Sequence, residues 1–215
     1  VQTPGDLADV LIAMNPAALK TNMKWVQPGA TIIVDVDSFD QKHCEKAGYD
    51  YDPLQSNDLN DYTVIKAPIT SLSRSTVNDL NLGIDVKTAD KTRNQFVMGM
   101  LIWLFNRDMK VEEEFIEKKF AKKPALIAPN VAVLHAGYNY ADTLEAVATQ
   151  FYVKPVAGKK GMFRQITGNT ATAWGLMAGA EKAGLKLFLG SYPITPASDI
   201  LHELCKHNHL GVKPF

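Results

Sequence analysis

Cysteine is scarce in this sequence, and its scarcity excludes two kinds of protein. Only two of the 215 residues are cysteines, Cys44 and Cys205, and they lie far apart. Two thiols cannot hold an iron–sulfur cluster alone, because such clusters take about four protein ligands. They also cannot form the disulfide framework that is typical of small secreted domains. We therefore expect a protein of the reducing cytoplasm, with no metal site of its own.

An excess of one charge and long apolar runs are also absent. Lysine and arginine together number 23, as do aspartate and glutamate, so the formal net charge is zero. Nucleic acid is not an expected partner, because binding phosphates needs a clustered positive excess. The longest apolar runs, such as residues 96–105, reach about half of the roughly 20 residues that cross a bilayer. We therefore expect no membrane-spanning segment, and the opening residues do not resemble a signal peptide.

The first part of the chain alternates between strand and helix patterns. Asn15 predicts the cap of a helix that stops at Pro28, and Ser38 predicts the cap of a second helix that ends at Gly48. Short apolar runs before, between and after these helices predict buried strands over residues 9–14, 31–36 and 62–66. Strands that alternate with helices through short connections predict a parallel sheet of the α/β class.

Helical patterns then continue to residue 151. Apolar residues recur at helical spacing over residues 88–106 and 111–122. Pro129 and Asn130 predict the start of a longer helix that ends near Phe151. Residues 1–151 are therefore interpreted as one parallel-sheet domain.

Residues 152–167 differ in composition from what precedes them. Prolines and glycines occur there together with four basic residues and no acidic residue. This composition is typical of a solvated linker between domains. A site for an anionic ligand is the alternative, which would depend on Lys154, Lys159, Lys160 and Arg164.

Residues 168–215 predict the start of a second α/β domain. A helix opens at residues 168–170 and ends at Gly184, a strand covers 185–189, and another helix covers 196–206. Gly175 and Gly179 weaken the first helix, so we expect them to admit a close neighbouring backbone. Because one strand and its helix do not complete a sheet, we expect the sequence to be a segment of a longer protein; a mature, processed chain is the alternative.

The turn over residues 190–198 has the features of a ligand site. It follows the predicted strand and precedes a helix, which is where open α/β sheets bind ligands. Pro193 and Pro196 restrict the backbone, so the Thr195 hydroxyl is positioned in advance to hydrogen-bond a carboxylate. The alternative is that Thr195 or Ser198 only caps the helix.

Two strings of this second part resemble a known family. YPITP over residues 192–196 and GNTATAWGLMAGAEKAG over residues 168–184 resemble the opening of the pyrimidine-binding domain in the alpha subunits of 2-oxoacid:ferredoxin oxidoreductases. Many members have a serine after the second proline of the turn, where this chain has Ala197 and keeps Ser198.

The first part resembles the gamma-type domain that some of these alpha subunits carry ahead of the pyrimidine-binding domain. The similar strings in residues 1–151 are DVLIAMNPAAL, QPGATIIVD and NQFVMGMLIWL. A glycine-rich strand–turn–helix normally opens that domain and is not found in this sequence. The resemblance therefore covers the whole chain and implies that the N-terminal part of the gamma-type domain is missing.

The resemblance implies a reaction and a role for the turn. Members of the family use thiamine diphosphate to decarboxylate a 2-oxoacid, transfer the acyl group to coenzyme A and pass electrons to ferredoxin. The gamma–alpha order favours 2-oxoglutarate, or a branched 2-oxoacid, over pyruvate as the substrate. Thr195 would be the catalytic residue, facing the thiazolium and the substrate carboxylate, with Tyr192 and Ser198 as further substrate-binding residues. No particular residue of this chain is implied as a cofactor ligand.

The resemblance also implies partner subunits. A beta subunit holds most of the thiamine diphosphate and its magnesium ion, and iron–sulfur clusters lie in beta or delta subunits. The glutamate that activates thiamine has no match in this sequence, so the segment alone is expected to be inactive. The alternative function is that of a module that binds coenzyme A or a nucleotide, or that fixes subunit assembly, without catalysis of its own.

Two other residue groups were weighed as sites. Asp35 and Asp37 follow a predicted strand, where a Rossmann fold places the acid that binds a ribose, but no glycine-rich motif precedes them. A strand-end turn is the simpler interpretation. The second possibility is a zinc site, whose candidate ligands are His202, Cys205, His207 and His209. Only His202 and Cys205 share a helix face. The alternative is that these side chains are simply exposed at the end of a helix.

Overall fold

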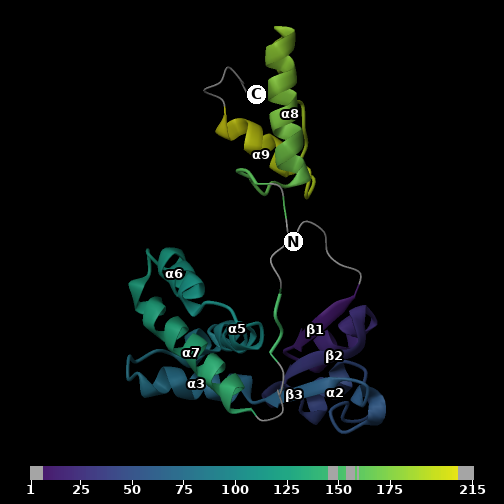
Figure 1. The fold of residues 1–215 in the computed structure, drawn as a ribbon, viewed down its shortest axis with the longest axis vertical. Coiled ribbons are helices and arrows are strands. Elements are labelled where there is room, and N and C mark those ends of the chain that lie inside the picture. Colours follow the sequence, from purple (N-terminus) through teal and green to yellow (C-terminus); the bar gives the residue numbers. More distant parts are fainter. Residues whose placement is uncertain (1–6, 145–149, 154–157, 159, 208–215) are drawn as a thin grey trace. The chain divides into compact units, whose positions relative to one another are not determined.

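The computed structural model describes residues 7–144, 150–153, 158 and 160–207. The described residues up to 153 form one compact unit, and those from 158 onward form another (Figure 1). The division lies within residues 152–167, the predicted linker. That the first unit is a gamma-type domain and the second a pyrimidine-binding domain stays a prediction.

A three-stranded parallel sheet lies at the centre of the first unit. Its strands are β1 (Ala8–Ala13), β2 (Val26–Asp35) and β3 (Thr63–Ala67), in the order β1-β2-β3. All three predicted strands form, and the predicted α/β class is confirmed. Leu11 pairs with Ile32, and Ile33 pairs with Ile65.

Strand β2 begins earlier than the sequence predicts. Val26 already pairs with Ala8, and the register then shifts before Val10. Pro28, which has no N–H to donate, and Gly29, with a φ of 79°, lie in this irregular stretch. Proline and glycine are tolerated in a strand at such irregularities. The prediction that Pro28 separates a helix from the strand was therefore wrong.

The two helices that connect the strands are short. Helix α1 (Pro16–Asn22) is capped as predicted, because the Asn15 side chain accepts a hydrogen bond from the Ala18 N–H at 2.8 Å. A 3₁₀ turn, Met23–Trp25, ends it earlier than expected. Helix α2 (Gln41–Lys46) is capped by Asp40, which accepts from the His43 N–H at 2.9 Å. The prediction of Ser38 as the cap was wrong, because Ser38 ends a separate 3₁₀ turn, Val36–Ser38.

Both faces of the sheet are covered. Ile32 and Val34 of β2 pack against Leu19 of α1 and Cys44 of α2 on one face. Because side chains alternate along a strand, the intervening Ile33 points to the other face. There the strands pack against later helices through Ile65, Ala67, Phe96, Met100 and Val133. Burial on both faces explains why the strands consist of nearly continuous apolar runs.

Within the described residues of the first unit, five helices follow β3. They are α3 (Ile69–Asp79), α4 (Val86–Asp90), α5 (Arg93–Leu104), α6 (Met109–Lys119) and α7 (Ile127–Thr143). Figure 1 shows α3, α5, α6 and α7 beside the sheet. The sequence did not predict α3, and the helix predicted over residues 88–106 is in fact α4 and α5. No helix in the described ranges is long and apolar enough to cross a bilayer.

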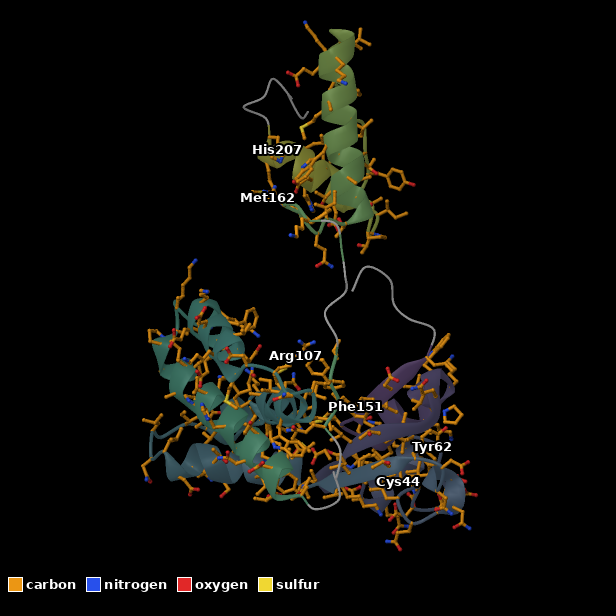
Figure 2. The ribbon with its side chains drawn as sticks, in the orientation of Figure 1. Cys44, Tyr62, Arg107, Phe151, Met162 and His207 are labelled. Atoms are coloured by element: carbon orange, nitrogen blue, oxygen red, sulfur yellow. The ribbon has the colours of Figure 1, made fainter. Side chains whose placement is uncertain are left out.

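Helix α7 differs at both ends from the prediction. It begins at Ile127, so Pro129 lies inside its first turn, where a missing N–H has no cost. It ends at Thr143 rather than near Phe151. The Phe151 N–H instead donates to the Leu104 carbonyl oxygen at 2.7 Å, and its ring stacks on Phe105 with centroids 5.4 Å apart (Figure 2). The described residues 150–153 therefore return to the end of α5.

The described part of the second unit contains two helices and the segment that connects them. Helix α8 (Gly168–Ala183) is capped by Thr167 and ends as predicted at Gly184, with a φ of 66°. Helix α9 (Ser198–Lys206) packs on it around Ala173 and Leu204. Among the residues that the structure describes, the predicted close approach at Gly175 and Gly179 is not found, because a β-carbon at either glycine would meet nothing within 4 Å.

The strand predicted over residues 185–189 is not formed among the described residues. Its side chains do alternate as in a strand, with Leu187 and Leu189 packed on the helices and Phe188 exposed. A strand also needs hydrogen bonds to a neighbouring strand. The described part of the second unit provides no such neighbour, so the segment stays extended without pairing.

Candidate functional site

The turn between residues 185–189 and α9 is held by backbone hydrogen bonds, such as that from the Ser198 N–H to the Ile194 carbonyl oxygen, and by three hydrogen bonds that involve side chains. The Ser198 hydroxyl accepts from the Ile194 N–H and donates to the Ile194 carbonyl oxygen, both at 3.1 Å. The Asn169 amide, in the first turn of α8, donates to the Pro196 carbonyl oxygen at 2.9 Å. The Ser198 and Asn169 side chains thus donate to the backbone oxygens of Ile194 and Pro196, the residues on either side of Thr195. The turn is therefore fixed from both of the helices that adjoin it.

The three predicted site residues have different surroundings. Thr195 is exposed, and its hydroxyl makes no hydrogen bond to any residue that the structure describes. Tyr192 is 71% exposed. The Ser198 hydroxyl, by contrast, is engaged within the turn. The Thr195 side chain also makes no helix-capping hydrogen bond, since α9 has no side-chain cap. Thr195 thus presents a hydroxyl that is available to a ligand.

The carboxylate of Glu203, on α9, makes a hydrogen bond to α8. Glu203 accepts hydrogen bonds from the Lys206 ammonium at 2.8 Å and the Trp174 indole N–H at 3.0 Å, and its other contact is the His207 ring at 3.3 Å. These contacts, the Lys206 hydrogen bond first and the Trp174 hydrogen bond second, lower the pKa of Glu203 from 4.5 to about 2. Of these contacts only the charge-assisted Trp174 hydrogen bond joins α8 to α9, because Lys206 lies on α9 with Glu203 and His207 caps that helix.

The candidate zinc ligands do not form a site where they are described. His202 lies 4.0 Å from Asp199, His207 contacts Glu203, and Cys205 is exposed (His207 is labelled in Figure 2). No group of three or more potential metal ligands occurs in the described ranges. His209 lies outside the described residues, as do Lys154 and Lys159 of the basic segment.

In the first unit, the aspartate that ends β2 and a second aspartate two residues later bind the start of α3. The buried Asp35 accepts from the Thr70 hydroxyl at 2.5 Å and from the Thr70 N–H at 3.2 Å. Asp37 accepts from the Ser71 N–H at 2.6 Å and from its hydroxyl at 2.9 Å. Both carboxylates satisfy N–H groups at a helix N-terminus that has no local cap. This arrangement supports the strand-end interpretation over a ribose site.

A cavity of about 440 Å³ lies beyond the carboxyl ends of β1 and β2. We call it the basic cavity, because its charged lining consists of Arg93, Lys46 and His43, with no carboxylate. Asn15 and Ser38 add polar side chains to its wall. No motif in the sequence predicts this cavity. Lys46 and His43 could have been noticed at helical spacing after a strand, but nothing local in the sequence brings Arg93 to them.

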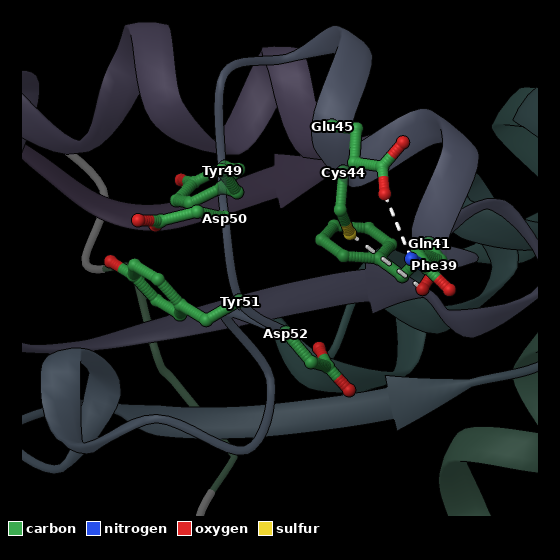
Figure 3. A pocket seen from close by; sticks show the side chains of 8 residues that line it. All are labelled: Phe39, Gln41, Cys44, Glu45, Tyr49, Asp50, Tyr51 and Asp52. Carbon is green, nitrogen blue, oxygen red and sulfur yellow. Dashed lines mark hydrogen bonds between the residues drawn. The ribbon is translucent and has the colours of Figure 1, made fainter.

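A second cavity, of about 340 Å³, has the opposite character (Figure 3). Cys44 is buried in its wall, and its thiol donates to the Phe39 carbonyl oxygen at 3.7 Å. Burial, more than nearby negative charge, raises the pKa of this thiol, so it stays protonated and is a poor nucleophile. The Tyr51 hydroxyl donates to Asp58, which raises the pKa of Tyr51 to about 12. Three carboxylates complete the wall and disfavour anions, those of Glu45, Asp50 and Asp52.

Comparison with known proteins gives one family. The family model described as pyruvate ferredoxin/flavodoxin oxidoreductase matches residues 1–140. The chain is 44% identical over its whole length to the 2-oxoglutarate oxidoreductase subunit KorA of Mycobacterium tuberculosis, of which it covers 33%.

A solved structure has the same fold. It is the 2-oxoglutarate:ferredoxin oxidoreductase from Magnetococcus marinus with 2-oxoglutarate, coenzyme A and succinyl-CoA bound. It aligns with all of this chain, at 23% identity and a TM-score of 0.69. The chain covers 32% of that structure, so it spans about a third of the length of either relative. On the match to the family model and the 44% identity, the chain belongs to the pyruvate ferredoxin/flavodoxin oxidoreductase family.

Proposed function

We propose that this chain is part of the alpha subunit of a 2-oxoacid:ferredoxin oxidoreductase that acts on 2-oxoglutarate. The observation that carries the proposal is the 44% identity over all 215 residues to a 2-oxoglutarate oxidoreductase subunit. The similarity includes the second unit, beyond the residues 1–140 of the family model. The reaction would convert 2-oxoglutarate and coenzyme A to the acyl-CoA and carbon dioxide, with two electrons passed to ferredoxin.

In this proposal Thr195 contacts the substrate. Its exposed hydroxyl can donate a hydrogen bond to a carboxylate of the 2-oxoacid, and a hydrogen bond to a charged acceptor is stronger than one to a neutral group. Asn169 and Ser198 hold the backbone on both sides of it. Little ordering is therefore needed when the substrate arrives, which favours positioning of the reacting carbon. Tyr192, largely exposed beside the turn, would line the same wall.

The cofactors would be held mostly by partners. Thiamine diphosphate, when bound, supplies the carbon nucleophile that makes decarboxylation of a 2-oxoacid possible. The residues of this chain fit one wall of such a site, since the turn presents a hydroxyl and backbone groups but no carboxylate. We assign the diphosphate with its magnesium ion to a beta subunit, and the iron–sulfur clusters to partner subunits. The assembled enzyme would work in the cytoplasm, with ferredoxin as the electron acceptor.

The test is to produce the full-length subunit with its beta partner under anaerobic conditions and to follow reduction of a viologen dye. 2-Oxoglutarate, pyruvate and a branched 2-oxoacid are compared at equal concentration. We expect turnover that requires coenzyme A and is fastest with 2-oxoglutarate. Turnover that is fastest with pyruvate would correct the substrate, and no turnover with any 2-oxoacid would refute the proposed function.

A second measurement tests the division of labour between subunits. The 215-residue chain alone should show no turnover and no measurable binding of thiamine diphosphate by calorimetry. Tight binding of thiamine diphosphate to this chain would contradict the assignment of that cofactor to the partner. The complete enzyme, measured in the same buffer, is the positive control.

A further inference from the structure

We propose that Asn169 is a positioning residue, which sets where the Thr195 hydroxyl meets the substrate without touching the substrate itself. The inference rests on the proposed function. Asn169 lies in the first turn of α8, and its amide donates to the Pro196 carbonyl oxygen at 2.9 Å. A carbonyl oxygen only accepts, so the amide must present its nitrogen here. An amide is therefore required at this position, and a carboxylate of the same shape could not replace it.

The Pro196 carbonyl oxygen is bonded to both helices. It accepts from the Asp199 N–H, in the first turn of α9, at 3.1 Å and from the Asn169 amide of α8 at 2.9 Å. A carbonyl oxygen has two lone pairs, so these two bonds use both of them. Pro196 directly follows Thr195 in the chain. The two donors together thus fix the backbone on one side of Thr195.

The carbonyl on the other side of Thr195 is held within the turn. Ile194 accepts from the Ser198 N–H at 3.0 Å and from the Ser198 hydroxyl at 3.1 Å. Neither bond reaches α8, and the bond from the Asp199 N–H does not either. Of the four bonds that hold the carbonyls beside Thr195, only the one from Asn169 ties the turn to α8.

The start of α8 is fixed without the Asn169 side chain. Thr167 is the cap, since its hydroxyl accepts from the Thr170 N–H at 3.2 Å and its carbonyl from the Ala171 N–H at 3.0 Å. Asparagine is also a weaker helix former than alanine. Replacing Asn169 by alanine should therefore not weaken the helix, and a loss of activity would have to come from the turn.

Other contacts keep α9 on α8 when the Asn169 amide is removed. Ala173 and Leu204 are buried between the two helices, and the Trp174 indole N–H donates to Glu203 at 3.0 Å. These contacts lie further along α8 than Asn169. The unit should stay folded in an Asn169 variant, while the turn gains freedom to move relative to α8.

Movement of the turn translates directly into movement of the Thr195 hydroxyl. Threonine is branched at its β-carbon and has few rotamers, so its backbone largely determines where the hydroxyl points. The hydroxyl makes no hydrogen bond of its own within the described residues that could hold it instead. A displacement of about 1 Å at a reacting group can cost about 100-fold in rate. Asn169 is therefore expected to act on turnover through Thr195.

The test uses the full-length subunit with its beta partner and measures kcat/KM for 2-oxoglutarate. Asn169→Ala, Thr195→Val and the double variant are compared with the unchanged enzyme. The matched control is Thr172→Ala, which also removes a side-chain hydrogen bond of 2.9 Å in α8, from the Thr172 hydroxyl to the Gly168 carbonyl oxygen. We expect Asn169→Ala to lose about tenfold in kcat/KM with an unchanged melting temperature. Thr172→Ala should stay within about twofold of the unchanged enzyme.

Coupling to Thr195 separates positioning from a general effect on the fold. In the Thr195→Val enzyme, Asn169→Ala should change kcat/KM by less than about twofold, because the hydroxyl it positions is already gone. Equal losses in both backgrounds, full activity of Asn169→Ala, or an equal loss in Thr172→Ala would each overturn the proposal. No turnover by the unchanged enzyme would refute the proposed function, whereas an active enzyme without this coupling would refute only the role of Asn169.

Discussion

Gly99 of α5 and Gly137 of α7 let the backbones of these two helices touch. A β-carbon on Gly99 would lie 2.0 Å from the Leu134 carbonyl oxygen and 3.1 Å from the Gly137 carbonyl carbon. A β-carbon on Gly137 would lie 1.9 Å from the Phe96 carbonyl oxygen. Backbone atoms within a helix cannot move aside as the end of a side chain can. The helical layer that covers the sheet in the first unit therefore depends on these two glycines.

Replacing either glycine should destabilise the first unit. In Gly99→Ala or Gly137→Ala the helices must separate, and overpacking of this kind costs about 1–3 kcal/mol, with the upper value expected here because the clash is with backbone atoms. Urea unfolding followed by circular dichroism would measure the loss. Gly175→Ala, where a β-carbon meets nothing within 4 Å, is the control and should gain about 0.5–1 kcal/mol in helix propensity. Equal effects at all three positions would contradict the close packing of α5 on α7.

The buried Asp35 should matter more than its exposed neighbour Asp37. Asp35→Ala removes the acceptor for two Thr70 donors, one of them an N–H at the start of α3, and should cost about 2–3 kcal/mol. Asp37→Ala removes a helix cap that water can partly replace, so it should cost about 1 kcal/mol. The free energies of unfolding of the two variants test the ranking. A larger loss in Asp37→Ala would contradict it.

Stability of the second unit should depend on acid pH through Glu203. The pKa of this carboxyl is about 2 in the folded chain and 4.5 as its ordinary value. Because the folded pKa is the lower one, the stabilisation is fully present above about pH 4.5 and is lost as the pH falls toward 2. The measurement is the free energy of unfolding against pH for the unchanged chain and for Glu203→Gln.

The quantity to compare is the free energy of unfolding of the unchanged chain minus that of Glu203→Gln. Titration of the other carboxyls contributes equally to both and cancels in this difference. The difference should be constant above about pH 4.5 and shrink steadily toward pH 2. A difference that does not change over this window would show that the charge of Glu203 does not join the helices. Glu181→Gln, an exposed glutamate of α8, serves as the control and should show no such trend.

Strands were easier to predict from the sequence than helix boundaries. The central run that became β2 is buried on both faces over residues 30–35, and the runs that became β1 and β3 are also mainly apolar, so all three are evident without knowing the fold. Helix α3 was missed because it is rich in serine and threonine and its start follows Pro68, which offers no side-chain cap. Its N–H groups are satisfied by Asp35 and Asp37, more than 30 residues earlier.

The candidate sites also differ in how far the sequence predicts them. The turn with Thr195 is contiguous in sequence, so its motif could be identified, although the engagement of Ser198 and the role of Asn169 needed the structure. The basic cavity joins Lys46 to Arg93, which only the fold brings together. The strand over residues 185–189 was predicted from its side chains, but pairing depends on a neighbour that no local pattern reveals.

Thr195 provides the most direct test of the proposed function. In the full-length subunit with its beta partner, kcat/KM for 2-oxoglutarate is compared among the unchanged enzyme, Thr195→Val and Thr195→Ser. The account predicts that Thr195→Val loses at least about tenfold with an unchanged melting temperature, because one hydrogen bond to a charged substrate is gone. Thr195→Ser, which keeps the hydroxyl, should retain most of the activity. A Thr195→Val enzyme as active as the unchanged one would contradict the account.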